Sequence, residues 1–188
     1  MERGSEVIFW RRTDMAGLER LTLMVSAVAV SAASTVVCVE DGGFRIDHRW
    51  TLSRDWRALL LEVEKWGAGG HARLTLERSG EGWKVDGMDR PDLDGADEPD
   101  LSVTPFCNTL PIRQLTTHKR DSLTLDTCYV DAASMMVARS RQRYDRLRPN
   151  VLRYIDLGLS AGFEADLQVD DSGLIVSYQG LFERVAAR

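Results

Sequence analysis

The chain has 188 residues, a formal net charge of −5, and 44% hydrophobic and 28% charged residues, close to an ordinary globular domain. This length predicts one domain spanning residues 1–188. The negative charge argues against nucleic acid as a partner, because nucleic-acid binders usually present a basic surface to the phosphates. Three cysteines, Cys38, Cys107 and Cys128, are too few for a disulfide framework, and we expect a reducing, cytoplasmic location.

The first long apolar segment spans residues 21–39, LTLMVSAVAVSAASTVVCV, and contains no charged side chain. It approaches the length of about 20 residues that a membrane-spanning helix needs. However, it is rich in Ala, Ser and Thr, and the residues before it mix acids and bases, unlike the basic start of a signal peptide. We expect buried strands here and no integral membrane segment, with a targeting or membrane role as the alternative.

Much of the remaining chain alternates between apolar and polar residues, which is the period of a half-buried strand. The clearest run is 44–52, and Leu59, Leu61 and Val63 share one face of the next. Alternation over 139–144 favours a strand over a helix. Glycine-rich segments at 41–43, 67–70, 79–82 and 171–173 are typical of hairpin turns. The pattern predicts an antiparallel meander, closed or strongly curled, without a long amphipathic helix.

Residues 86–111 are rich in Asp, Pro and Gly and lack periodicity, which predicts a long loop of the kind that is often functional. A standard calcium loop is excluded, because Arg90 and Leu101 fall where carboxylates are required. A looser cation site is an alternative, but we predict no metal and no cofactor. Asp97, Glu98 and Asp100 are candidates for the acid/base chemistry of sugar hydrolysis. That chemistry requires two of their carboxyl groups to face each other across the glycosidic bond.

Other motifs have simpler interpretations. GLSAG at 158–162 matches a nucleophile elbow, but the next run alternates as a strand and no histidine follows His118, so we predict a turn between strands. The cysteine and histidine spacings fit no zinc site. We expect Cys38 and Cys128 in the core and Cys107 exposed in the loop.

The aromatic and basic side chains leave two alternatives open. The five tryptophans either fill the core or line a cavity. The arginines between residues 139 and 148 either form a solvated strand face or a polar rim for an anionic or sugar head group. The arginines concerned are Arg139, Arg141, Arg143, Arg146 and Arg148.

The segment 93–115, LDGADEPDLSVTPFCNTLPIRQL, resembles the signature of a bacterial family described as "putative glycolipid-binding" proteins. GEGWKVDG before it, and RQRYDRL, RYIDL and VDDSGLIVSYQGLFERV after it, agree with the family in the same order. The chain departs from the signature at Ala96, at the extra residue in Glu98-Pro99, and at Gln114, where a second arginine is common. The matching positions are Leu93, Asp94, Gly95, Asp97, Asp100, Leu101, Thr104, Pro105, Asn108, Thr109, Leu110, Pro111, Ile112 and Arg113.

The resemblance implies a mainly β fold, a single antiparallel sheet curled into a spiral β-roll or half-barrel similar to lipoprotein carriers. It implies an apolar concavity that holds an acyl chain, with a polar rim, in a non-enzymatic lipid- or glycolipid-binding protein. Amide, carboxylate and guanidinium groups suit a sugar head group because they form directed hydrogen bonds. The candidate ligand-binding residues are Asp94, Asp97, Asn108, Thr109, Arg113, Tyr144 and Tyr154.

Three alternatives remain. The same signature residues can cap turns and tie down a long loop without touching a ligand. The chain can be a hydrolase that uses the loop carboxylates or Cys107 on a sugar or acyl substrate. It can also be a structural or interaction protein that forms a homodimer through exposed sheet edges.

Overall fold

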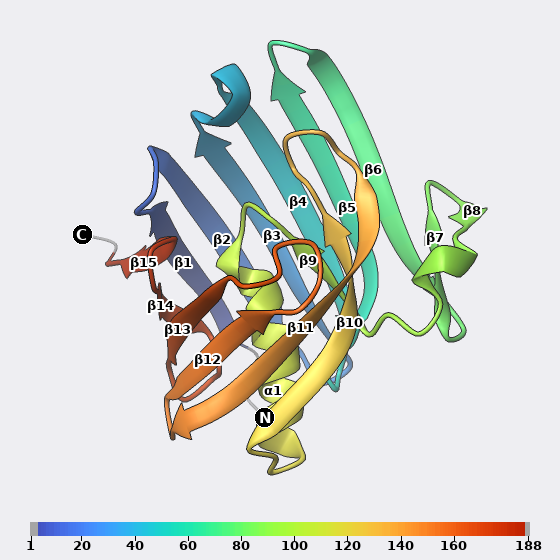
Figure 1. Ribbon diagram of the computed structural model, residues 1–188. Coiled ribbons are helices and arrows are strands. Elements are labelled where there is room, and N and C mark those ends of the chain that lie inside the picture. Colours follow the sequence, from blue (N-terminus) through green and yellow to red (C-terminus); the bar gives the residue numbers. More distant parts are fainter. Residues whose placement is uncertain (1–3, 187–188) are drawn as a thin grey trace.

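In a computed structural model of the protein, which describes residues 4–186, one 15-stranded sheet curls around a short helix (Figure 1). Three 3₁₀ helices, η1 (Glu40–Gly42), η2 (Pro91–Leu93) and η3 (Pro105–Asn108), and one α-helix, α1 (Thr109–Thr117), complete it. The strands are β1 (Gly4–Arg12), β2 (Gly17–Val25), β3 (Ala29–Cys38), β4 (Phe44–Ser53), β5 (Ala58–Gly67), β6 (Gly70–Ser79), β7 (Gly82–Val85), β8 (Met88–Asp89), β9 (Glu98–Leu101), β10 (Ser122–Val130), β11 (Val137–Arg148), β12 (Val151–Asp156), β13 (Glu164–Val169), β14 (Ile175–Tyr178) and β15 (Phe182–Val185).

The strand order is β8-β7-β6-β5-β4-β3-β2-β1-β15-β14-β13-β12-β11-β10-β9. The first and last long segments of the chain therefore meet in the middle of the sheet, where β1 pairs with β15. The predicted mainly β, curled fold is confirmed. One detail differs, because β9 runs parallel to β10 and makes the sheet mixed. The parallel pair arises because the chain crosses the roll through η3 and α1 before it enters β10.

The alternating runs form the predicted strands. Phe44, Ile46, His48, Trp50 and Leu52 all point into the interior from β4. The uncharged segment 21–39 lies in β2 and β3, and small side chains occupy the outer positions of β3. No helix in the described part of the chain is both long and apolar enough to cross a membrane.

One register prediction is wrong. Leu59 was expected to share a buried face with Leu61 and Val63, but it is 41% exposed while both of them are fully buried. Thr51 pairs with Leu60 and Leu52 pairs with Ala58, so Leu59 is the extra residue of a β-bulge. Because of the bulge, the side chains of Leu61 and Val63 point into the interior in the rest of β5.

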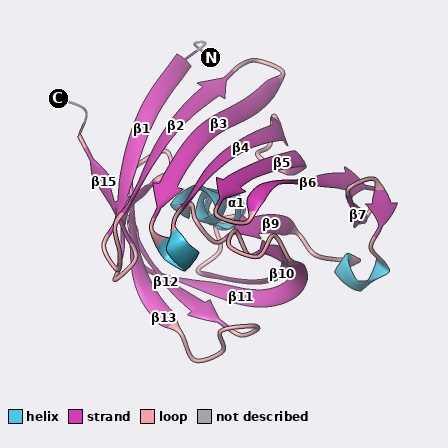
Figure 2. Cartoon of the chain, turned by 90° about the horizontal axis from the view of Figure 1, so that it is seen from above, coloured by secondary structure: helices cyan, strands magenta, loops and turns pink. Residues whose placement is uncertain are grey.

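The prediction of a loop over 86–111 is also wrong in part, because this region contains η2, β9, η3 and the start of α1. The Thr104 hydroxyl caps η3 by accepting a hydrogen bond from the Phe106 N–H at 3.1 Å, and Pro105 follows at the first helical position. Figure 2 shows α1 inside the curl, surrounded by strands. Phe106, Leu110 and Leu115 are fully buried there, so the signature segment fills much of the roll.

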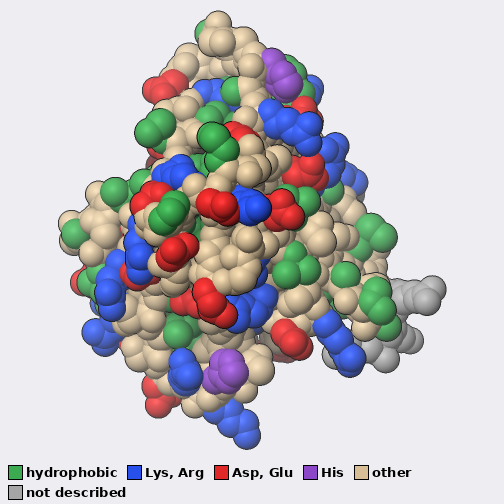
Figure 3. Space-filling view, turned by 90° about the vertical axis from the view of Figure 1, so that its right-hand side faces the viewer, with side chains coloured by type: hydrophobic (Ala, Val, Ile, Leu, Met, Phe, Trp, Pro, Cys, Tyr) green, Lys and Arg blue, Asp and Glu red, His purple; other side chains and the backbone are tan. Residues whose placement is uncertain are grey.

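The outer surface carries basic and acidic side chains interspersed, as the view onto one side of the molecule shows (Figure 3). Arg139, Arg141 and Arg143 point outward from β11, and Arg139 pairs with Asp126 at 2.6 Å. These arginines form a solvated strand face. The outermost strands in the sheet order are β8, with two residues, and β9, which contains Pro99. Because β7 pairs with β6 only over 76–79 and β9 pairs with β10 only over 127–130, the rest of β6 and β10 has no strand partner on its outer side within the described residues. The homodimer stays a prediction.

Candidate functional site

A pocket of about 240 Å³ opens beside η3, and residues from distant parts of the sequence meet in it. Its walls come from η3, from the end of β9, from β10, from β12 and β14 with the turns that follow them, and from the start of β15. It mixes carboxylates, hydroxyls and aromatic rings. The lining residues are Asp100, Leu101, Ser102, Thr104, Cys107, Asn108, Tyr129, Tyr154, Asp156, Ser160, Phe163, Tyr178, Leu181 and Phe182.

Asp100 provides one carboxylate of the pocket. Its Oδ1 accepts a hydrogen bond from Cys107 Sγ at 3.0 Å, and its Oδ2 accepts one from Gln142 Nε2. Burial raises the pKa of Asp100, while these two hydrogen bonds oppose the rise. A carboxylate has more acceptor positions than these two donors use, so Asp100 can still accept hydrogen bonds from a ligand in the pocket.

Asp156 provides the second carboxylate, at the end of β12. Its Oδ1 accepts hydrogen bonds from the N–H groups of Gly158 at 2.8 Å and Ser160 at 3.1 Å. Its Oδ2 accepts one from the Tyr154 hydroxyl at 3.2 Å. Asp156 therefore organises the β12–β13 turn, and it also lines the pocket.

Gly158 allows this turn to lie close to β11. A Cβ at Gly158 would come within 2.5 Å of the Arg141 backbone nitrogen and of Ser140 Oγ. The Leu157 N–H donates to the Arg141 carbonyl at 2.8 Å, which holds the turn in place. The glycine of the GLSAG motif thus has a packing role, and the motif is a turn between two strands, as predicted, rather than a nucleophile elbow.

We expect Gly158→Ala to lower the free energy of unfolding by about 1–3 kcal/mol, because the backbone of β11 cannot move away from the added methyl group. Urea unfolding of the purified variant measures this change. Gly69→Ala is the matched control, since a Cβ there meets nothing within 4 Å. Equal stability of the two variants would show that the turn does not need a close approach to β11.

Four aromatic rings, those of Tyr154, Phe163, Tyr178 and Phe182, form one part of the pocket wall. Tyr154 lies 5.9 Å from Tyr178 and 6.1 Å from Phe163, measured between ring centroids, and Tyr178 lies 6.2 Å from Phe182. No described residue hydrogen-bonds the Tyr178 hydroxyl. The wall therefore offers aromatic faces together with one unused hydroxyl group.

A buried polar layer lies behind the pocket. The Tyr144 hydroxyl is 2.8 Å from Asn108 Oδ1 and 3.1 Å from Gln142 Oε1, and Gln142 in turn donates to Asp100. Tyr144 is only 1% exposed and burial raises its pKa. These contacts fix the positions of Asn108 and Asp100 rather than present Tyr144 to a ligand.

Cys107 was expected to be exposed, and this prediction is wrong. It is 4% exposed and lies on η3, with Sγ 3.0 Å from Asp100 Oδ1 and 3.1 Å from the Thr104 carbonyl. Burial and the Asp100 carboxylate raise the pKa of the Cys107 thiol well above its usual range. The Cys107 thiol donates a hydrogen bond to Asp100 in the pocket wall.

Thr104 is held by a second buried network. Its hydroxyl donates to Glu19 Oε1 at 2.9 Å, and the same oxygen lies 2.7 Å from Ser34 Oγ and 3.1 Å from His48 Nε2. Trp50 donates to His48 Nδ1 at 2.9 Å, which leaves the proton of the neutral ring on Nε2. The network connects β2, β3 and β4 to the start of η3.

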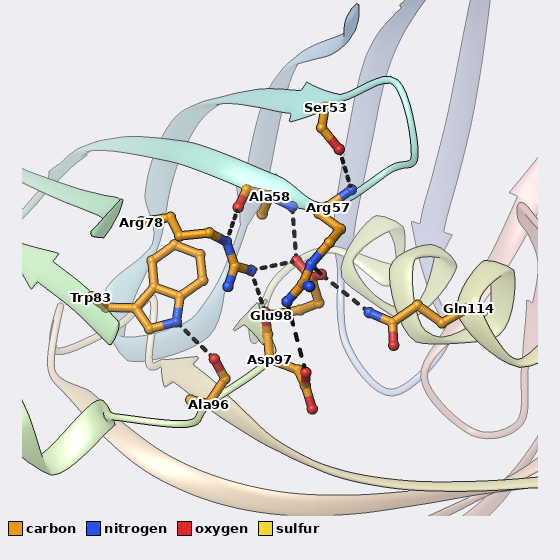
Figure 4. Close-up of polar contacts among 9 residues, drawn as sticks. All are labelled: Ser53, Arg57, Ala58, Arg78, Trp83, Ala96, Asp97, Glu98 and Gln114. Atoms are coloured by element: carbon orange, nitrogen blue, oxygen red, sulfur yellow. Dashed lines mark hydrogen bonds and ion pairs between the residues drawn. The ribbon is translucent and has the colours of Figure 1, made fainter. Parts of the chain in front are cut away.

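Glu98 anchors β9 to the other side of the roll (Figure 4). Its Oε2 accepts a hydrogen bond from the Ala58 N–H at 2.8 Å and lies 3.4 Å from Arg78 Nη2, and Gln114 Nε2 donates to Oε1 at 3.2 Å. Burial raises the pKa of Glu98 to about 7, against the opposing effects of Ala58 and Arg78. The anchor holds β5, β6 and α1 around the strand that carries Asp100.

The predicted ligand-binding residues do not form one site. Asn108 and Tyr154 line the pocket, and Tyr144 lies directly behind it. Thr109 is fully buried on α1. Asp94 lies in an exposed turn, where its carbonyl accepts a hydrogen bond from Arg139 at 2.8 Å. Asp97 and Arg113 line a different cleft.

Sequence reasoning did not assign Asp156, Tyr178 or Phe163 to the site. Asp156 and Tyr154 stand two residues apart on β12, so a shared inward face was a usable signal. Asp100 was considered with Asp97 and Glu98 as an acid/base set, but these three side chains have different surroundings. No group of three or more His, Cys, Asp or Glu side chains within residues 4–186 is arranged to hold a metal ion.

Comparison with known proteins supports the resemblance seen in the signature. A family model described as "Putative glycolipid-binding" matches residues 7–184. Among solved structures, the chain is similar to a DUF1089 family protein from Pseudomonas aeruginosa, with 30% sequence identity and a TM-score of 0.78. That similarity covers 89% of this chain and 92% of the other. A search of curated proteins gives no match.

Proposed function

Because this chain belongs to the family described as "Putative glycolipid-binding", we propose that it binds a glycolipid without transforming it and holds the sugar head group in the pocket beside η3. The observation that carries the proposal is the combination of two carboxylates, Asp100 and Asp156, with an aromatic wall in one pocket. Carboxylates accept hydrogen bonds from sugar hydroxyls. The electron-rich faces of aromatic rings suit the C–H bonds of a sugar ring.

The size of the pocket supports a head group rather than a whole lipid. A volume of about 240 Å³ lies below the usual range of about 300–1,000 Å³ for drug-sized ligands. Leu157, Leu159 and Phe163 are exposed on the β12–β13 turn, next to pocket residues Asp156 and Ser160. In the proposal the acyl chain leaves the pocket over these side chains. Exposed apolar groups of this kind mark binding surfaces when they gather at one place.

The proposal includes a cytoplasmic location and no nucleic-acid partner. Cys38, Cys107 and Cys128 are free thiols and all are buried, which suits a reducing compartment. The net charge of −5 does not favour contact with a phosphate backbone.

Native mass spectrometry of the purified protein tests the proposal. We expect an adduct of glycolipid mass that is lost on denaturation, and lipid analysis of the extract then identifies the ligand. Delipidated protein should regain a lipid from a bacterial extract, and should bind octyl glucoside at least about tenfold more tightly than octanol. A clean apo mass, no lipid regained and no preference for the glucoside would contradict glycolipid binding.

Hydrolysis of a glycoside is the second candidate, favoured by one observation. Asp100 and Asp156 line the same pocket, and burial, with a contribution from the Asp156 charge, raises the pKa of Asp100. A carboxylic acid beside a second carboxylate is the pair that glycosidases use. Release of nitrophenol from nitrophenyl glycosides, abolished in Asp100→Asn, would support it. Intact glycosides after prolonged incubation would support binding alone.

A further inference from the structure

We propose that a second ligand site lies at the other end of α1, and that it binds the phosphate group of a single-chain anionic lipid. The site is a cleft of about 480 Å³ that contains Arg54, Arg57 and Arg113 beside Trp56. It shares no lining residue with the pocket beside η3. The inference therefore stands whether or not that pocket binds a sugar.

The guanidinium groups of this cleft have unused hydrogen-bond donors. Elsewhere Arg11, Arg139 and Arg184 hold a carboxylate at 2.6–2.7 Å. In contrast, no carboxylate within residues 4–186 lies within ion-pair distance of Arg54 or Arg113, and Arg113 donates only to the Ser172 carbonyl, at 2.5 Å. Arg57 reaches Asp97 and Glu98 only at 3.9 Å. Guanidinium forks of this kind match the oxygens of a phosphate.

Among the residues that line the cleft itself, arginines outnumber carboxylates. Asp55, Asp97 and His118 line it together with the three arginines. Burial raises the pKa of Asp97, and Arg57 and Arg78 oppose that rise. The lining therefore carries more guanidinium groups than carboxylates, which favours an anion.

Trp56 fixes the direction of Arg113. The guanidinium carbon of Arg113 lies 3.9 Å from the centroid of the Trp56 ring, a stacked cation–π contact. Trp56 adopts a φ of +64°, in the left-handed region that a bulky side chain seldom occupies, at the turn between β4 and β5. Such backbone conformations are concentrated at ligand-binding sites. The stack holds the Arg113 fork in place before a ligand arrives.

An apolar groove adjoins the arginine cleft and suggests the rest of the ligand. Arg54, Asp55, Trp56 and Arg113 also border a depression of about 380 Å³ whose other lining residues are mainly apolar. Glu6 and Asp55 are the two acidic residues that line it. The groove would hold an acyl chain while the phosphate contacts the arginines. The apolar residues are Leu23, Val25, Val30 and Leu174.

Isothermal titration at low ionic strength tests the site with three probes: inorganic phosphate, glycerol 3-phosphate, and a lysophosphatidic acid with a twelve-carbon chain, kept below micelle formation. We expect the lysophosphatidic acid to bind at least about tenfold more tightly than glycerol 3-phosphate and than the uncharged monoacylglycerol of the same chain. Equal affinity for glycerol 3-phosphate would overturn the lipid and point to a free phosphate. No binding of any phosphate probe would overturn the site.

The variants separate binding from folding. Arg113→Gln and Arg54→Gln should each weaken lysophosphatidic acid binding at least about fivefold, and Arg54→Gln should leave the melting temperature unchanged because Arg54 is exposed. Arg141→Gln is the matched control. Like Arg57, Arg141 has a carboxylate only at 3.9 Å, that of Asp126, but it lies exposed on the outer face of the sheet. Equal losses in all three variants would overturn the assignment of the anion to this cleft.

Discussion

Replacing Glu98 with alanine is expected to lower the free energy of unfolding by about 3–5 kcal/mol, the usual cost of removing one partner from a buried ion pair. Glu98 is 1% exposed, and Arg78, the Ala58 N–H and Gln114 all direct donors at it (Figure 4). In the variant the buried Ala58 N–H would lose its acceptor, and Arg78 would lose the carboxylate that pairs with its charge while keeping the carbonyls of Ala58 and Asp97. Urea unfolding at pH 7 measures the loss. The control Glu77→Ala removes an exposed carboxylate from β6 and should change stability by less than about 0.5 kcal/mol.

The same residue predicts a pH dependence. The pKa of Glu98 is about 7 in the folded protein, against 4.5 for an ordinary glutamate side chain, so the folded chain binds more protons than the unfolded chain between these values. Ionisation of Glu98 therefore lowers the free energy of unfolding as pH rises from about 4.5 to about 7, by on the order of 3 kcal/mol. Above pH 7 this contribution no longer changes with pH. Glu98→Gln should remove this slope while keeping an acceptor for Ala58. A slope identical in the wild type and Glu98→Gln would assign the pH dependence to other groups.

Asp100→Asn is expected to weaken glycoside binding by about tenfold to a hundredfold, the effect of losing hydrogen bonds to a charged acceptor. The amide keeps the shape of the carboxylate but has one acceptor oxygen instead of two, and its nitrogen would face either Cys107 or Gln142. Titration of octyl glucoside, followed by native mass spectrometry, measures the change.

Two further variants make that result specific. Tyr178→Phe removes a hydroxyl that no described residue hydrogen-bonds, so it should weaken binding with little change in the melting temperature. Asp47→Asn alters an outer-face carboxylate on β4, hydrogen-bonded by Thr35 at 2.8 Å, and should leave binding unchanged. If Asp100→Asn and Tyr178→Phe bind the glucoside as well as the wild type, the pocket beside η3 is not the head-group site.

The signature segment combines two roles that its sequence does not separate. Asn108 reaches the pocket and Leu110 fills the roll, while Asp94 lies in a turn at the surface. Gln114, which replaces the second arginine of the family signature, donates to Glu98. Departures from the signature therefore alter the anchor of β9 as well as the surfaces open to a ligand.

The sequence by itself determined many of the strands, several of the turns and the family. Alternation over 44–52 specifies inside and outside because successive side chains in a strand point to opposite faces. The Asp171-Ser172-Gly173 turn was predictable from the sequence because the turn requires a positive φ, which glycine adopts easily, and Gly173 has a φ of +81°. The long segment 93–115 identified the family without any knowledge of its fold.

Only the tertiary structure decided the helix, the bulge and both candidate sites. The helix α1 is short, carries Pro111 in its first turn and is stabilised mainly by burial inside the roll, so local propensity gave little sign of it. The bulge at Leu59 depends on pairing with β4. Asp100, Asp156 and Tyr178 belong to three separate elements, and only the curl of the sheet around η3 brings them into one pocket. Periodicity in the sequence indicates which face of the sheet a residue occupies. The curvature of the sheet and the register of its strands decide which residues distant in sequence meet in one site.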